Sequence, residues 1–155
     1  GFQERIENGR IAGKNLLLLV NELPNKSAND TLYVVAHSMG FAYSLGIIEV
    51  LRGRINFGGF YIMAPENATS GKVKLKEWKE IWQYGSKFES KGGDAPCLLD
   101  GVAPQTIIKG LSEKHRAYIP KQFYKKKGFF DSHFVGYYTW VFDIKKGKIG
   151  SITQR

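Results

Sequence analysis

The strongest constraint on the fold is a short apolar segment followed, after four residues, by a longer one. Residues 31–36 read Thr-Leu-Tyr-Val-Val-Ala, and residues 41–51 read Phe-Ala-Tyr-Ser-Leu-Gly-Ile-Ile-Glu-Val-Leu. The first segment is almost wholly apolar and rich in β-branched residues, which is typical of a strand covered on both faces in a parallel sheet. The second has its apolar residues at helical spacing. Together they predict a central strand, a four-residue turn and a helix that packs against the sheet.

Three further elements are predicted around this pair. Residues 2–23 have helical periodicity and stop before a proline, although Gly9 and Gly13 weaken the helix. Residues 58–64 are an apolar run ended by proline, and residues 80–84 are a second run ended by glycine and serine, so both are predicted strands. Because a helix separates strand 31–36 from strand 58–64, the two are expected to be parallel.

The elements of the second half are less regular. We expect a short helix at residues 105–111 and a strand at 116–119, while residues 134–142 fit either a helix or a strand and the tail could close as a hairpin. The alternation of strands and helices places the chain in the α/β class, as a three-layer sandwich around a mostly parallel sheet. At 155 residues it is expected to be a single domain spanning residues 1–155.

Composition excludes several classes of protein. The single cysteine, Cys97, cannot form an intrachain disulfide, and with three histidines and no HExxH or paired-cysteine spacing no metal site is expected. The phosphate-binding loop GxxxxGK[ST] is absent, so no cofactor is expected either. The longest apolar run, Leu16–Val20, is far shorter than the roughly 20 residues that cross a bilayer. The chain is therefore expected to be a soluble protein without a transmembrane segment.

The positive charge is concentrated in the last third of the chain. Residues 1–100 hold 12 basic and 11 acidic residues, whereas residues 101–155 hold 11 and 3, which gives net charges of +1 and +8. Lysines and aromatic residues alternate in residues 118–130, a composition that suits contact with an anionic membrane surface and, less well, with nucleic acid. One hypothesis is therefore a non-catalytic binding module that uses this basic region.

A catalytic hypothesis comes from Ala-His-Ser-Met-Gly, residues 36–40, between the predicted strand and helix. Small residues at Ala36 and Gly40 would let strand and helix approach closely, and the turn would lift the Ser38 hydroxyl to the N-terminus of the helix, where backbone N–H groups favour developing negative charge. The segment resembles the nucleophile elbow of the α/β-hydrolase family, in its lipase and esterase branch. The resemblance implies a serine hydrolase that acts on carboxylic esters.

Such an enzyme also needs a general base. His37 adjoins the nucleophile and is expected to point away from it, and His115 precedes a predicted strand. His133 remains, and it lies late in the chain, as the histidine of the family does. The resemblance therefore implies His133 as the base.

The acid of the triad and the oxyanion hole are assigned by the same resemblance. Asp100 begins Asp-Gly-Val-Ala-Pro, which is similar to the stretch around the catalytic aspartate of several bacterial lipases, and it is the first choice. Asp94, in the same predicted loop, and Glu66, after the preceding strand, are the alternatives. The oxyanion hole would use the backbone N–H of Met39.

The resemblance covers residues 2–142 but corresponds only to the C-terminal half of the family's fold. The N-terminal strands and the second oxyanion donor have no counterpart in the sequence. Three explanations follow: a fragment whose N-terminal half is missing, a chain completed by a second copy in a homo-oligomer, or a degenerate hydrolase. In each case an uncovered edge at residues 31–36 would be prone to pair with another strand. The expected partner of the site is a small-molecule or lipid ester.

Overall fold

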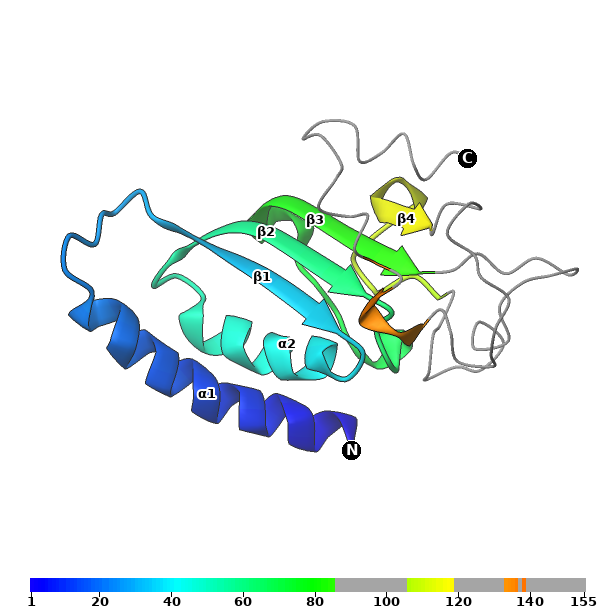
Figure 1. Ribbon diagram of the computed structural model, residues 1–155, viewed down its shortest axis with the longest axis horizontal. Helices are drawn as coiled ribbons and strands as arrows, with labels where there is room; N and C mark the ends of the chain where they lie inside the picture. Colours follow the sequence, from blue (N-terminus) through cyan, green and yellow to red (C-terminus); the bar gives the residue numbers. More distant parts are fainter. Residues whose placement is uncertain (86–105, 119–132, 137, 139–155) are drawn as a thin grey trace, which may run out of the picture.

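The computed structural model describes residues 1–85, 106–118, 133–136 and 138, and Figure 1 shows their arrangement. The two helices and four strands are α1 (Phe2–Glu22), β1 (Thr31–His37), α2 (Gly40–Leu51), β2 (Asn56–Met63), β3 (Trp78–Gly85) and β4 (Arg116–Tyr118). Short 3-10 turns occur at η1 (Ala68–Ser70), η2 (Leu75–Glu77) and η4 (Glu113–His115). The strands at the start and the middle of the chain therefore lie within two residues of their predicted bounds.

The four strands form one sheet in the order β1-β2-β3-β4, and every neighbouring pair is parallel. This confirms the predicted α/β class with a parallel sheet. His37 pairs with Met63, and Met63 with Tyr84, so the carboxyl ends of β1, β2 and β3 are level. In Figure 1 the arrowheads accordingly meet at one edge of the sheet. Residues that follow the strands are thereby gathered at that edge, which is where ligands bind in open α/β sheets.

Helix α2 packs on the sheet and α1 packs on α2, so both helices lie on the same side of it (Figure 1). Their crossing depends on glycine. A Cβ at Gly9 would lie 2.0 Å from the Tyr43 carbonyl oxygen, and one at Gly46 would lie 2.0 Å from the Ile6 carbonyl oxygen. The glycines that weaken α1 in the sequence are thus the residues that bring it against α2. Backbone contact here offsets the conformational cost of glycine in a helix.

The core lies between the sheet and the helices. Its central side chains alternate along the strands, and all are at most 3% exposed: Ala36, Phe60, Ile62 and Ile81 from the sheet, with Phe41, Ile48 and Leu51 from α2. The rings of Phe57 and Trp78 stack at 4.6 Å between centroids and close the core at the start of the strands. Apolar side chains with period two in the strands and helical spacing in α2 therefore form one continuous core.

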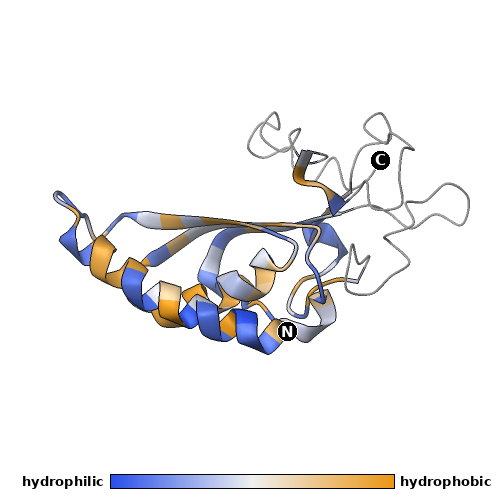
Figure 2. Cartoon of the chain, turned by 60° about the horizontal axis from the view of Figure 1, so that its bottom comes forward, coloured by the Kyte–Doolittle hydropathy of each residue, from blue (hydrophilic) through white to orange (hydrophobic). Residues whose placement is uncertain are grey.

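The prediction that β1 is a central strand covered on both faces is wrong. Within the ranges described, β1 pairs only with β2, so it is the edge of this sheet. Tyr33 is 56% and Val35 57% exposed, because neither α-helix covers the face on which they lie, as the side view in Figure 2 shows. An apolar strand sequence does not distinguish two covered faces from one face that carries exposed apolar side chains.

The predicted helix at residues 105–111 is also wrong where the structure describes it. Residues 106–111 form a loop, in which the Gln83 side chain donates from Nε2 to the Thr106 carbonyl (2.8 Å) and accepts the Ile108 N–H on Oε1 (3.0 Å). Gln83 is fully buried, so these bonds satisfy an amide that has no access to water. Backbone groups that would form a helical turn are bound to a side chain of β3 instead.

The remaining predictions on the second half are only partly covered. The strand predicted at 116–119 is confirmed as β4, which ends at Tyr118. Of residues 134–142, residue 134 is a bend and residues 135, 136 and 138 lie in 3-10 turns, and the predicted tail hairpin lies outside the described ranges. None of the helices that the structure describes, α1 and α2 included, is both long enough and apolar enough to cross a membrane.

Candidate active site

Ser38 lies at the carboxyl edge of the sheet, in the two-residue turn between β1 and α2. Its φ is +55°, a left-handed backbone conformation that is uncommon for residues other than glycine. Three hydrogen bonds hold the turn: the Ser38 N–H donates to the Met63 carbonyl (3.1 Å), and the Ser38 carbonyl accepts the N–H groups of Phe41 (3.1 Å) and Glu66 (3.3 Å). The strained backbone is thus fixed by β2 on one side and α2 on the other.

The small residues on either side of Ser38 have different surroundings. Ala36 is 3% exposed and belongs to the core, as the sequence predicts for a strand close to a helix. Gly40 begins α2, but a Cβ at this position would meet no atom within 4 Å. The space around Gly40 therefore gives no steric reason for a small residue at this position, whereas Ala36 lies inside the packed core.

Of the described side chains that contact the Ser38 hydroxyl, His133 lies closest. Its Nε2 lies 2.8 Å from the Ser38 Oγ, although the two residues are 95 positions apart in the sequence. The His133 side chain is half-buried, and its Nδ1 is inaccessible to solvent. With the proton of a neutral ring on Nδ1, Nε2 accepts the hydroxyl proton of the serine, which is the geometry of a general base next to a nucleophile. The structure therefore brings together two of the three residues chosen for the triad.

His37, which the sequence predicts to point away from the serine and not to serve as the base, lies against His133. Its Nε2 is 2.5 Å from the His133 backbone carbonyl oxygen, and the two ring centroids are 5.1 Å apart. Since a carbonyl only accepts hydrogen bonds, His37 Nε2 carries the proton. His37 is the last residue of β1, so this bond ties the segment that carries His133 to the sheet. Sequence reasoning missed this contact because nothing in the local pattern shows which distant segment lies beside residue 37.

Glu66 is the one candidate acid within the described ranges, and its carboxylate faces the serine. Its Oε2 lies 3.4 Å from the Ser38 Oγ, a long and weak hydrogen bond beside the 2.8 Å contact to His133. Two residues around it, Ala64 (φ +41°) and Asn67 (φ +53°), have left-handed backbones. The other two candidates, Asp94 and Asp100, lie outside the residues described.

The backbone around Met39 suits the stabilisation of an anion. Met39 is the N-cap of α2, next to the nucleophile, and its N–H donates to no group in the part of the chain that the structure describes. The first N–H groups of a helix have no partner within the helix and carry the positive end of its dipole. A negative charge that develops beside Ser38 would therefore meet a free donor.

The other chemically active residues do not join this group. His115 is bound to Ser112, whose N–H and Oγ lie 3.3 Å and 3.0 Å from its Nδ1, and burial together with the charge of Lys114 lowers the pKa of His115. Cys97 and almost all of the basic aromatic stretch at 118–130 are outside the described ranges. Among the residues that are described, no three His, Cys, Asp or Glu side chains gather as metal ligands.

Comparison with protein-family models, with curated proteins and with solved structures yields no significant match. The site is therefore interpreted from its own geometry.

Proposed function

We propose that the chain is a serine hydrolase of carboxylic esters, with Ser38 as nucleophile and His133 as general base. The observation that carries the proposal is the 2.8 Å contact between His133 Nε2 and the Oγ of a serine held at φ +55° between a strand and a helix. A serine hydroxyl is a weak nucleophile unless a base is placed to take its proton. Strained backbone conformations cluster at functional sites, and a serine that is only by chance close to a histidine would have no need of one.

The reaction follows from these atoms. The Ser38 Oγ attacks the ester carbonyl carbon while its proton passes to His133 Nε2, and the carbonyl oxygen becomes an oxyanion beside the Met39 N–H. When the tetrahedral intermediate collapses, the proton on His133 goes to the leaving alkoxide, so an alcohol departs and an acyl-serine remains. Water then attacks the acyl-serine with His133 again as base, and the carboxylic acid is released.

A third group is needed to orient the base. The acid that holds the ring of His133 is Asp100 in our proposal, with Asp94 and Glu66 as alternatives. Glu66 contacts the serine oxygen, and an acid with the orienting role would instead accept the proton on His133 Nδ1. The geometry therefore gives Glu66 a weaker claim to this role than its nearness to Ser38 suggests.

A fluorophosphonate probe tests the proposal, because it forms a covalent bond only with an activated serine. We expect labelling of the intact chain, with the adduct on the peptide that contains Ser38, and loss of labelling in Ser38→Ala and His133→Ala. Ser70→Ala is the matched control, since Ser70 is an exposed serine at the end of η1, and it should label like the wild type.

The outcomes separate the two hypotheses. An adduct on another serine, or unchanged labelling of His133→Ala, contradicts the proposed roles. A folded protein that is not labelled but binds anionic vesicles in a salt-dependent manner supports the non-catalytic binding module instead. Circular dichroism of each variant shows that the chain remains folded.

A further inference from the structure

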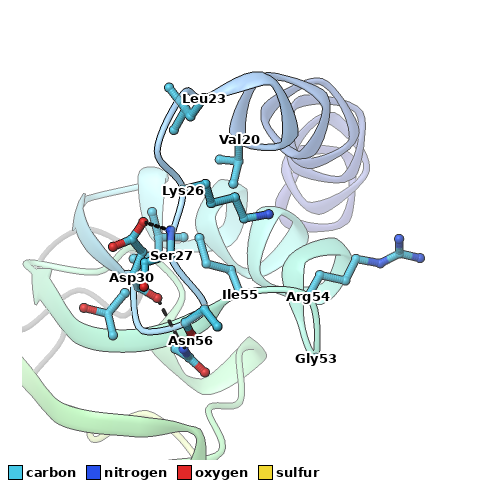
Figure 3. Close-up of a pocket in the computed structure, with 12 residues that line it drawn as sticks. Val20, Leu23, Lys26, Ser27, Asp30, Gly53, Arg54, Ile55 and Asn56 are labelled. Atoms are coloured by element: carbon cyan, nitrogen blue, oxygen red, sulfur yellow. Dashed lines mark hydrogen bonds between the residues drawn. The ribbon is translucent and has the colours of Figure 1, made fainter.

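A hollow of about 640 Å³ lies at the amino edge of the sheet, opposite the edge that carries Ser38 (Figure 3). It is lined by the end of α1, by the connection that leads into β1 and by the turn between α2 and β2. Thr31, which lines it, and Ser38 lie at the two ends of β1, about 20 Å apart at the rise of a strand. This distance separates the hollow from the candidate active site. The volume of the hollow falls within the ~300–1,000 Å³ range of small-molecule pockets.

Its lining is largely apolar. Val20, Leu32 and Ile55 are half-buried, and Leu23 is 57% exposed. These four side chains come from three different segments and line the same hollow, and Figure 3 labels Val20, Leu23 and Ile55 among them. An alkyl group placed there would remove apolar area from water at about 25 cal/mol per Å².

Two cations at the rim have no carboxylate partner within the part of the chain that the structure describes. Lys26 Nζ donates to the neutral Asn21 Oδ1 (3.0 Å), and the Arg54 guanidinium forms neither a hydrogen bond nor an ion pair with the residues described. The single acidic residue of the lining, Asp30, accepts the backbone N–H of Ser27 (2.8 Å). In Figure 3 the Lys26 side chain extends across the hollow near Val20 and Ile55, and the Arg54 side chain extends outward from its rim.

Two other arginines, Arg10 and Arg52, differ from Arg54 because each binds a carboxylate. Arg10 binds Glu7 and Glu49, and Arg52 binds Glu77 through two contacts, the closer one at 2.5 Å. Among the described residues, the charges of Lys26 and Arg54 at the rim are thus not paired with a carboxylate.

The rim is also held in place without a ligand. Asn56 Nδ2 donates to the carbonyl oxygens of Ala28 (2.7 Å) and Asp30 (3.3 Å), and the Asn29 N–H donates to the Ser27 Oγ (3.1 Å). These bonds tie the connection before β1 to the start of β2. A preorganised rim lowers the entropic cost of binding.

We propose that this hollow binds an unbranched amphiphilic monoanion. The carboxylate or sulfate head would lie between Lys26 and Arg54, and the alkyl chain would cover Val20, Leu23 and Ile55. The net charge of the lining, two cations and one carboxylate, selects an anion over a neutral molecule of the same length. The site does not involve Ser38, so this proposal is tested independently of the proposed hydrolase activity.

The test uses decanoate below its micelle concentration, titrated into the full chain and followed by amide NMR shifts. We expect saturable shifts at Leu32, Gly53 and Ile55, which line the hollow, and binding of decanol at least about fivefold weaker because it lacks the charge. Acetate, which has the charge but no chain, should cause no saturable shift.

Variants separate the two parts of the ligand. Arg54→Gln is expected to weaken decanoate about fivefold and to leave decanol unchanged, whereas Leu23→Ser weakens both. Lys14→Gln is the matched control, because Lys14 is an exposed lysine of α1 that does not line the hollow. Shifts confined to the surroundings of Ser38 and His133, equal binding of decanol and decanoate, or an unaltered affinity in Arg54→Gln each overturn the proposal.

Discussion

The two edges of the sheet differ in how their residues are held. At the carboxyl edge, polar groups of Ser38, His133 and His37 lie 2.5–2.8 Å apart. At the amino edge, apolar side chains line a hollow whose rim is held by ordinary hydrogen bonds in the connection before β1. The carboxyl edge therefore gathers polar groups, whereas the amino edge carries an apolar hollow.

Backbone strain follows the same division. Of the four non-glycine residues with positive φ in the part of the chain described, Ser38, Ala64 and Asn67 lie at the carboxyl edge, and the fourth, Asn25, follows α1. Each such residue costs on the order of 1–3 kcal/mol, and asparagine tolerates the conformation best. Strain is thus concentrated where the chemistry is proposed. Substitutions at the two edges should accordingly affect different properties, and the following predictions test this difference.

The largest effect is expected for Ser38→Ala. Ester hydrolysis should fall by on the order of 10⁶, as when the nucleophile of a comparable triad is removed. The melting temperature should stay within a few degrees, because alanine keeps the left-handed backbone and loses only the hydroxyl. Measured kcat for a p-nitrophenyl ester and a thermal unfolding curve give both quantities. Retained turnover would move the nucleophile to another residue.

The acid gives the next largest effect. Asp100→Asn should lower kcat by on the order of 10³ to 10⁴, as for triad aspartates elsewhere, while Asp94→Asn and Glu66→Gln remain much closer to the wild type. The measurement is kcat of the three variants side by side. If Asp94→Asn or Glu66→Gln shows the large loss instead, that residue is the acid. Three small effects would indicate a Ser-His dyad.

A smaller effect at the same edge is expected for His37→Ala. The variant removes the hydrogen bond to the His133 carbonyl, so the base is positioned less well and kcat should fall about tenfold, with KM little changed. His37→Gln, whose amide N–H can still reach the carbonyl, should restore most of the activity. His115→Ala is the control, because His115 is bound to Ser112. Equal losses in His37→Ala and His37→Gln would contradict a positioning role.

The smallest effect belongs to the amino edge. Asn56→Ala removes the bonds to the Ala28 and Asp30 carbonyls and should lower the free energy of unfolding by about 1 kcal/mol. Because the edge lies far from Ser38, kcat should not change. Chemical denaturation measures the loss, and Asn29→Ala is the control, since only its backbone N–H is hydrogen-bonded. A fall in kcat would show that the two edges are coupled.

Local patterns predicted much of the carboxyl edge. The strand, the turn at Ser38 and α2 follow from residues that are neighbours in the sequence. His133 is chosen because the other two histidines are excluded and because the resemblance places the base late in the chain, and its role stays a prediction. Contacts between distant segments were not accessible in the same way. From the sequence alone, Gly9 only weakens a helix, and its packing against Tyr43 of α2 is visible only in the structure. The hydrogen bond of His37 to the His133 carbonyl is likewise visible only in the structure. The edge position of β1 depends on which strands pair, which an apolar run does not encode.

The left-handed backbone of Ser38 has an evolutionary consequence. Glycine adopts this conformation without steric cost, so Ser38→Gly should raise stability by about 1 kcal/mol while removing the nucleophile. Stability alone would then favour drift toward glycine at this position. Selection for a reaction that needs the hydroxyl would oppose that drift. A lineage that had lost the chemistry would be expected to lose this serine early, well before the apolar residues of β1 and α2 changed.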